Sequence, residues 1–330
     1  MKKLFSIFIA LNIILAAVYV TAASVEEMKN TSAWYIYNNI TDPQVSSVGG
    51  EWAVIGLKKS GIDIPQEYYD RYYSNLEKYL TERNGVLHER KYTEYSRVIL
   101  ALNTIGKNPA NVYGYNLITP LCDYSSTIKQ GLNGAVWALI ALDSGNYVND
   151  EIQATREMYV DLILSRQLPD GGWAMVADEE YSDVDITAMA IKGLSPYVGN
   201  IKVKNAIENG LEFLSKNQNE DGGFSSYGEE NSDSGAQVLM AMTSAGVSID
   251  DPRFVKNGNT VIDFIEKFYI DGGGFKHTSA DTLNFMATEQ CLYAISEFLQ
   301  GEDKVSIKKG NNDRLRIFFK YVAETKEMIK

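Results

Sequence analysis

One short turn occurs three times along the chain at nearly constant spacing, and this repeat limits the possible folds more than any other feature. The pattern is Asp-Gly-Gly with an aromatic residue shortly after it, and it starts at Asp170, Asp221 and Asp271. Glycine can take the positive φ that ends a helix, and the aromatic ring can pack back on the layer it leaves. A period of about fifty residues is typical of tandem supersecondary units that cover each other's hydrophobic faces.

A nearly uncharged apolar segment follows each turn after a short polar stretch. When these segments are aligned by their last apolar residue, three earlier copies are found, which makes six. Segments so rich in apolar and small residues are typical of helices that are buried nearly all round. We therefore expect six inner helices, at residues 48–57, 93–102, 133–142, 185–194, 233–242 and 286–295.

Amphipathic stretches alternate with the inner segments. Each has one apolar stripe at helical spacing with charged residues elsewhere, which predicts an outer helix. The expected outer helices are residues 25–40, 66–82, a weaker stretch at 111–126, 151–166, 201–217 and 255–268. A row of helix pairs leaves two open ends, whereas a ring of six pairs leaves none. The sequence thus predicts an all-α protein, an α/α toroid of six inner and six outer helices.

The two ends of the chain differ from the repeats. Lys2 and Lys3 precede an apolar run at 4–20 and then small residues, which predicts a secretory signal peptide at 1–23, with an uncleaved membrane anchor as the alternative. We expect the toroid domain at 24–300 and a mildly basic tail at 301–330 that forms one amphipathic helix. The tail is either solvated or a membrane-surface or partner contact. The expected location is secreted or extracellular, in association with the cell envelope.

Charge and cysteine content exclude some classes of function and leave others open. The formal net charge of −12 argues against nucleic acid as a partner, because nucleic-acid binders need a basic footprint. Cys122 and Cys291 are the two cysteines, so at most one disulfide can form. The sequence shows neither whether they pair nor what the oligomeric state is.

The repeat resembles that of the terpenoid cyclase and protein prenyltransferase superfamily. The stretch 210–224, with Gln218 followed by Asp221-Gly-Gly-Phe224, is similar to the QW motif of squalene-hopene cyclases. The stretches 88–97, 133–146 and 286–290 look like secreted bacterial proteins with prenyltransferase/squalene oxidase repeats. The resemblance implies the toroid fold, but a fold does not by itself imply a reaction.

One motif is similar to the acid motif of class II terpene cyclases. In Asp183-Val-Asp185-Ile-Thr187, the resemblance makes Asp185 the proton donor with Asp183 beside it. Such an acid must stay protonated through burial and hydrogen bonds. Ile186 replaces an Asp of the family motif, and the other interpretation is that Asp183 or Asp185 caps an inner helix.

Two other activities of the superfamily lack their residues. Prenyltransferases hold Zn²⁺ through Asp, Cys and His, whereas this chain has Asp233-Ser-Gly235 at the Asp-x-Cys position. Thioester domains need Cys-Gly-Glu-Gln, and this chain has Ala287-Thr-Glu-Gln290. We expect neither a metal nor a cofactor. A carrier role of the transcobalamin kind requires no catalytic residue and stays open.

Parallel inner helices would bring all their N-termini to one mouth of the ring, where unpaired N–H groups and helix dipoles meet. Polar and aromatic residues there would line a concave small-molecule site, with Tyr181 and Tyr227 as further walls. The expected ligand-binding residues are Glu51, Trp52, Glu94, Tyr95, Asn133, Trp137, Asp233, Gln237, Glu289 and Gln290.

The predicted function is that of an exported binding module. It would capture a small molecule, isoprenoid-like or cobalamin-like, or a cell-envelope partner, and would touch a membrane only through an uncleaved signal or the basic tail. The alternative function is a class II cyclase-like enzyme that uses Asp185 as its acid.

Overall fold

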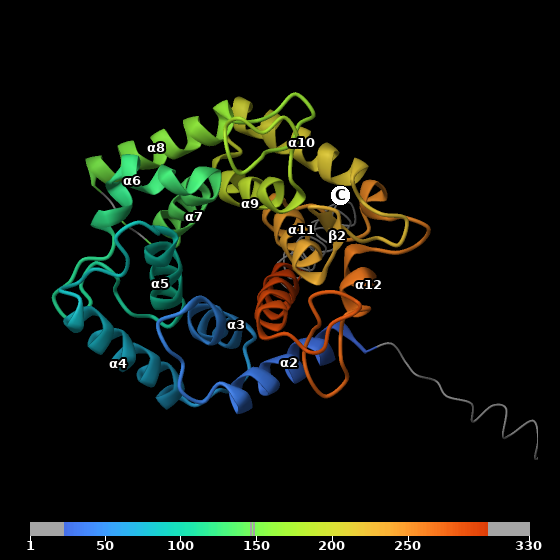
Figure 1. The fold of residues 1–330 in the computed structure, drawn as a ribbon. Helices are drawn as coiled ribbons and strands as arrows, with labels where there is room; N and C mark the ends of the chain where they lie inside the picture. Colours follow the sequence, from blue (N-terminus) through green and yellow to red (C-terminus); the bar gives the residue numbers. More distant parts are fainter. Residues whose placement is uncertain (1–22, 146, 148, 303–330) are drawn as a thin grey trace, which may run out of the picture.

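The computed structural model of the protein describes residues 23–145, 147 and 149–302. These residues form an α/α toroid, with inner helices around a central axis and outer helices in a second ring around them (Figure 1). The fold predicted from the repeat is confirmed. The predicted signal peptide, apart from Ala23, and the predicted tail from residue 303 onward lie outside the described residues.

Six inner helices lie within the described residues, close to the predicted positions. Each consists mostly of buried side chains, as the lack of charge predicted. They are α3 (Trp52–Lys59), α5 (Thr93–Thr104), α7 (Gly131–Asp143), α9 (Val184–Leu194), α11 (Ser232–Ala245) and a helix over 285–302.

The ring closes where the 285–302 helix meets the first inner helix. A Cβ atom on Gly56 would lie 3.2 Å from Leu292 Cδ2, so the two helices approach closely. The Gly49 N–H also donates a hydrogen bond of 2.9 Å to Glu289 Oε1 across this joint. Gly49 lies in an irregular π-type turn, Ser47–Glu51, where its φ of 72° suits glycine. First and last repeats are therefore in direct contact.

The outer ring is less regular than predicted. Its helices are α2 (Val25–Asn39), α4 (Gln66–Glu82), α6 (Tyr124–Thr127), α8 (Asp150–Ser165), α10 (Ile201–Lys216) and α12 (Val261–Glu266). Four of them match the predicted stretches within a residue or two, but α6 and α12 are short.

The prediction of a helix over 111–126 was wrong for most of its length. The side chains of Asn108, Asn111 and Asn116 accept hydrogen bonds from nearby backbone amides, which holds the chain in turns until a 3₁₀ turn at Thr119–Cys122. The predicted helix at 255–268 likewise starts too early. Thr260 caps α12 there, with a reciprocal capping box to Asp263.

The repeated turn joins the two rings as expected. Gly171, Gly222 and Gly272 all have positive φ, and the aromatic residues after them, Trp173, Phe224 and Phe275, are fully buried. The indole N–H of Trp173 donates to the carbonyl of Ile163 at 2.7 Å, at the end of the preceding outer helix. The Trp173 ring therefore packs against the outer layer.

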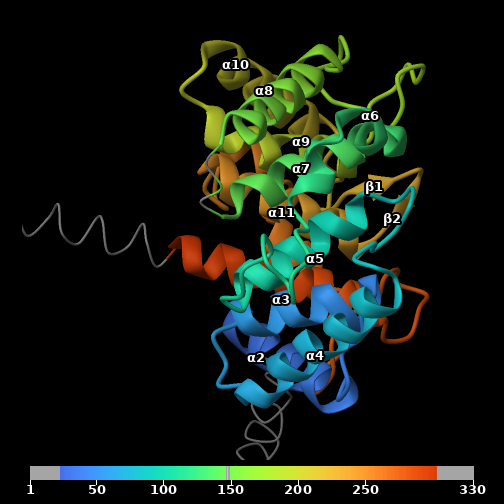
Figure 2. The same cartoon turned by 90° about the vertical axis from the view of Figure 1, so that its left-hand side faces the viewer.

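Two short strands, β1 (Ser225–Ser226) and β2 (Glu229–Glu230), form a hairpin that the sequence did not predict. Figure 2 shows this hairpin at one end of the ring and the C-terminal end of the 285–302 helix at the other. Among the described residues, no helix is both long and apolar enough to cross a bilayer. Cys122 and Cys291 are free thiols.

Candidate functional site

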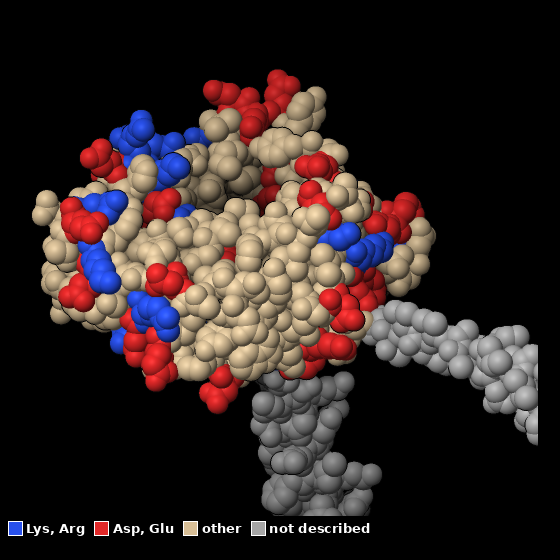
Figure 3. Space-filling view, turned by 60° about the horizontal axis from the view of Figure 1, so that its bottom comes forward, with Lys and Arg blue, Asp and Glu red and all other residues tan. Residues whose placement is uncertain are grey.

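The first turns of all six inner helices surround one cavity of about 610 Å³. This cavity, the N-terminal mouth, shows that the six helices run in the same direction. Each inner helix contributes at least one lining residue. In chain order, examples are Trp52, Thr93, Asn133, Asp185, Asp233 and Gln290. The mouth is an open hollow, seen obliquely near the top of Figure 3.

The structure brings seven of the residues predicted for a site into this mouth. They are Trp52, Asn133, Trp137, Asp185, Asp233, Gln237 and Gln290, and Tyr227, expected as a wall, also lines it. Gln237 donates through its amide to Gln290 Oε1 at 3.3 Å, which links α11 to the last inner helix.

Five predicted residues do not line the mouth. Asp183 is the N-cap of α9, since its Oδ1 accepts from the Ile186 amide at 3.0 Å, so the capping interpretation holds for Asp183. The hydroxyl of Tyr95 accepts from the Leu87 amide at 3.1 Å, and Glu94 pairs with Arg97.

The remaining two, Glu51 and Glu289, are fully buried beneath the mouth. The irregular turn before α3 directs Glu51 toward the outer helix α4, where it accepts from the Tyr72 hydroxyl at 3.0 Å. Burial raises the pKa of both carboxyl groups to about 8. Tyr181, expected as a wall, is 82% exposed and is not among the lining residues.

Several lining residues escaped the sequence analysis. Arg97 lies one helical turn after Thr93 on α5, so the i, i+4 spacing could have placed it on the same face. His277 lies in a loop and Ser226 in the two-residue strand β1, and neither segment is long enough for a periodicity that indicates which way a side chain points. Met189 and Met286 complete the apolar part of the wall.

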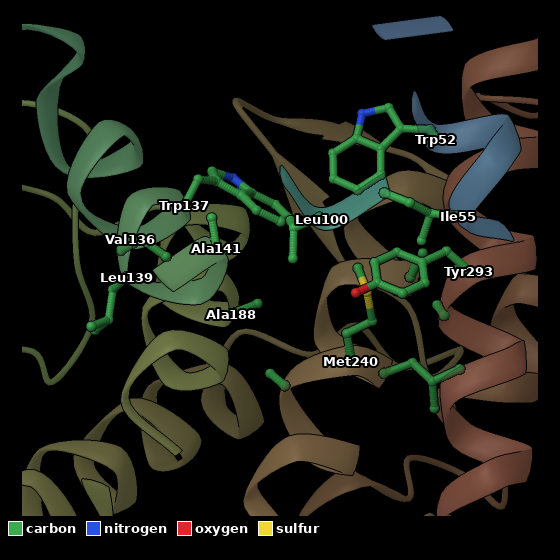
Figure 4. Close-up of a cluster of buried hydrophobic side chains, with 14 of the residues drawn as sticks. Trp52, Ile55, Leu100, Val136, Trp137, Leu139, Ala141, Ala188, Met240 and Tyr293 are labelled. Atoms are coloured by element: carbon green, nitrogen blue, oxygen red, sulfur yellow. The ribbon is translucent and has the colours of Figure 1, made fainter. Parts of the chain in front are cut away.

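Two tryptophans form the floor of the mouth. The rings of Trp52 and Trp137 meet edge to face with centroids 5.2 Å apart, and each is only 6% exposed. Figure 4 shows them pointing toward Leu100, Met240 and Tyr293 on the ring axis. This cluster separates the mouth from a second cavity.

Three buried oxygen atoms in the wall have no hydrogen-bond partner among the described residues. They are Oδ1 of Asn133, of Asp185 and of Asp233, from three successive inner helices. Buried polar atoms are nearly always hydrogen-bonded, and each exception needs an explanation. Three such atoms in one cavity indicate a surface that accepts hydrogen bonds from something bound there.

The two aspartates differ in their electrostatic environment. Burial raises the pKa of Asp185 to about 6. Nearby hydroxyl groups, chiefly that of Ser234, offset part of this rise, whereas the charges of Asp183 and Asp233 add to it. Burial also raises the pKa of Asp233, but His277 opposes the rise, because its Nδ1 lies 2.6 Å from Asp233 Oδ2. The mouth thus holds one weakly acidic carboxyl group and one imidazole–carboxylate pair.

The mouth is acidic overall. Arg97 pairs with Glu94 at 2.5 Å, so its charge is compensated locally, and its Nε lies 3.6 Å from Glu51. Exposed acidic residues lie in the loop after the first repeated turn and on the hairpin, at Asp178, Glu180, Glu229 and Glu230.

Within the part of the chain that the structure describes, no group of three His, Cys, Asp or Glu side chains is placed to hold a metal ion.

The opposite end of the ring has a cavity of about 560 Å³ at the C-terminal ends of the inner helices. Lys59 and Lys192 both bind Glu297 there, at 3.0 and 2.6 Å. Although burial opposes it, the two ammonium groups hold the pKa of Glu297 at about 2. Both lysines also lie over the Tyr293 ring. The polar groups at this end largely satisfy one another.

Comparison with known proteins agrees with this fold. A family model described as a prenyltransferase alpha-alpha toroid domain matches residues 132–251. No curated protein matches the chain in sequence. The matched segment is about a third of the chain, and the described residues as a whole have the α/α toroid fold that the name of this model gives.

Solved structures with the same fold are distant in sequence. Protein geranylgeranyltransferase-I of Candida albicans, complexed with GGPP, is 13% identical, with a TM-score of 0.56 over 82% of this chain and 91% of its own. A variant of the type II terpene cyclase MstE from Scytonema, with geranylgeranyl dihydroxybenzoate, is 10% identical (TM-score 0.58; 86% and 100% covered). A polysaccharide lyase is 9% identical (TM-score 0.59; 86% and 98% covered).

Proposed function

We propose that the protein is an exported binding module that captures a small molecule or a cell-envelope partner in the N-terminal mouth. The three unpartnered oxygens of Asn133, Asp185 and Asp233 carry this proposal. A buried polar group left without a partner costs about 1–3 kcal/mol, and a ligand that donates to these atoms recovers that free energy. Export rests on the apolar, signal-like segment at residues 1–23.

The volume and form of the mouth support binding. A cavity of about 610 Å³ lies within the range of small-molecule sites, which combine apolar walls with a few fixed polar groups. The proteins of similar fold include toroids described with isoprenoid ligands and a polysaccharide lyase, so the fold accommodates ligands of different classes. Isoprenoid-like and cobalamin-like ligands, suggested by the family resemblance, are candidates on that ground.

A second candidate function is a class II cyclase-like reaction started by Asp185. The pKa of about 6 favours it, because at pH 7 about a tenth of the Asp185 carboxyl groups are protonated. The open mouth argues against it, since carbocation chemistry needs a dry, enclosed cavity. Binding is therefore the function that the geometry supports better.

A ligand screen by thermal shift tests the first proposal. A ligand at about a hundred times its Kd adds about 2.7 kcal/mol to the free energy of unfolding. We expect Asn133→Ala to remove the shift and Trp34→Ala, at an outer-helix residue that is 44% exposed, to keep it. A shift that both variants retain would place binding elsewhere and refute the proposal.

Turnover of a polyprenyl substrate tests the second candidate. If the protein converts such a substrate, Asp185→Asn must abolish turnover while substrate binding persists. Unchanged turnover in this variant removes Asp185 as the acid.

A further inference from the structure

We infer that the ligand of the N-terminal mouth is a carbohydrate, a neutral chain of hydroxyl-rich pyranose rings, rather than an isoprenoid. This inference rests on the proposed function, because it names the ligand class for the same cavity. Four properties of the wall support it: polarity, the mixture of donors and acceptors, charge, and the aromatic residues.

The wall is mostly polar. Twelve of its seventeen residues are polar or charged, and five are aromatic or Met. An isoprenoid chain that filled this space would leave the buried oxygens of Asn133, Asp185 and Asp233 without hydrogen-bond partners. A hydroxylated ligand can donate to these oxygens and recover the free energy that their burial without hydrogen bonds costs.

The polar groups of the wall include both acceptors and a donor. Asn133 Oδ1 accepts hydrogen bonds only, as do the ionised carboxylates of Asp185 and Asp233. The side chain of Asn133 also carries an NH₂ group that donates, whereas Arg97 Nε lies 3.6 Å from Glu51 Oε2 beneath the mouth. A hydroxyl group both donates and accepts, whereas an ammonium group only donates and a phosphate mainly accepts. Adjacent hydroxyls on one ring therefore match this mixture best.

The charge of the mouth disfavours anionic ligands. The carboxylates of Asp185, Asp233 and Glu229 face the cavity, while the charge of Arg97 is compensated by Glu94. Exposed acidic side chains on neighbouring loops extend this field, which repels a diphosphate before contact. A neutral sugar meets no such barrier, and its hydroxyls can donate to the carboxylates.

An aromatic side chain at the entrance is placed to contact the C–H face of a sugar ring. Tyr227, 83% exposed, lines the entrance with Met286, which is 44% exposed, while Trp52 and Trp137, each 6% exposed, close the floor. An aromatic ring offers a flat apolar surface with little loss of conformational entropy on binding. Because the mouth is open, the rest of an oligosaccharide can extend beyond the hairpin into solvent.

The test is isothermal titration calorimetry on the full chain with defined probes: cellotetraose, maltotetraose, xylotetraose, tetra-N-acetylchitotetraose and, as the isoprenoid, geranylgeraniol. We expect at least one oligosaccharide to bind. Asn133→Ala should weaken its affinity about tenfold, which is the loss of one well-placed hydrogen bond. Tyr227→Ala should also weaken it and cannot unfold the core, because this side chain is exposed. Ser144→Ala, in the opposite cavity, is the matched control and should have no effect.

Each outcome decides a specific point. Geranylgeraniol binding that depends on Asn133, with no oligosaccharide bound, overturns the carbohydrate inference and leaves the proposed function intact. Oligosaccharide binding that neither Asn133→Ala nor Tyr227→Ala weakens overturns the site. If no probe binds in a manner that depends on these residues, the carbohydrate inference fails. The proposed function fails as well if a broader thermal-shift screen finds no ligand whose binding depends on Asn133.

Discussion

Two fully buried carboxyl groups lie at the joint that closes the ring, and we predict that they make stability fall as pH rises. Glu51 precedes the first inner helix and Glu289 belongs to the last, and both side chains are 0% exposed. Each accepts one hydrogen bond, from Tyr72 and from the Gly49 N–H respectively. One buried oxygen of each has no hydrogen-bond partner among the described residues. Burial therefore favours the neutral acid and raises the pKa of both to about 8.

The magnitude follows from linkage between protonation and folding. An ordinary Glu carboxyl group has a pKa of 4.5, so between pH 4.5 and 8 the unfolded chain has lost a proton that the folded protein keeps. The stabilisation is fully present below pH 4.5 and is lost as pH rises through 8. At 1.36 kcal/mol for each tenfold difference in proton affinity, the loss is about 5 kcal/mol for one group. The two losses do not add fully, because part of the rise at Glu289 comes from charge on Glu51.

Urea unfolding at pH 6 and at pH 8.5 measures this loss. Glu51→Gln and Glu289→Gln imitate the neutral acid, and we expect each variant to lose about 2–3 kcal/mol less than the wild type, because only the part of the window between pH 6 and 8 is sampled. At pH 8.5 each should be more stable than the wild type. Glu229→Gln is the control, because the Glu229 carboxyl group is exposed and its removal relieves no cost of burial. The same pH slope in all four proteins, or variants that are less stable at pH 8.5, would refute the reasoning.

Three further predictions concern the repeat and the opposite cavity. Gln218→Ala removes the amide donor to the carbonyls of Gly222 and Phe254, both at 2.9 Å. Urea unfolding should show a loss of about 1–3 kcal/mol in the free energy of unfolding. An unchanged free energy would contradict the role of this side chain in the turn. Asp183→Ala removes the cap of α9 and should cost about 1 kcal/mol in thermal unfolding, while Asp183→Asn should keep most of it. The low pKa of Glu297, about 2, adds stability that is fully present above pH 4.5 and is lost as pH falls toward 2. Glu297→Gln should therefore cost about 3 kcal/mol at pH 7. That difference should vanish near pH 2, and a constant difference would exclude the ionic origin.

The fold could be predicted because it is a property of the repeat. The uncharged segment at 133–142 and its five counterparts needed only helical periodicity to be identified as inner helices. Prediction failed at 111–126 because three asparagines bind the local backbone and hold it in turns, a competition that the apolar pattern does not show. Local side-chain chemistry overrode periodicity there.

The site could be predicted only in part. Asn133 and Asp233 line the mouth as expected, because parallel inner helices place their first turns together. Glu51 does not, because the irregular turn at Gly49 changes the direction of the chain just before α3. His277 lies beside Asp233 through a long-range contact between a loop and α11, and a single sequence gives no signal for such a contact.

A crystal structure of the protein with the oligosaccharide that binds most tightly tests most directly whether the N-terminal mouth is the ligand site. The predicted result is a sugar ring on the Trp52 and Trp137 floor, with hydroxyl groups within hydrogen-bond distance of Asn133 Oδ1 and Asp185 Oδ1. A ligand bound instead in the opposite cavity beside Lys192, or on the outer helices with the mouth unchanged, would contradict it.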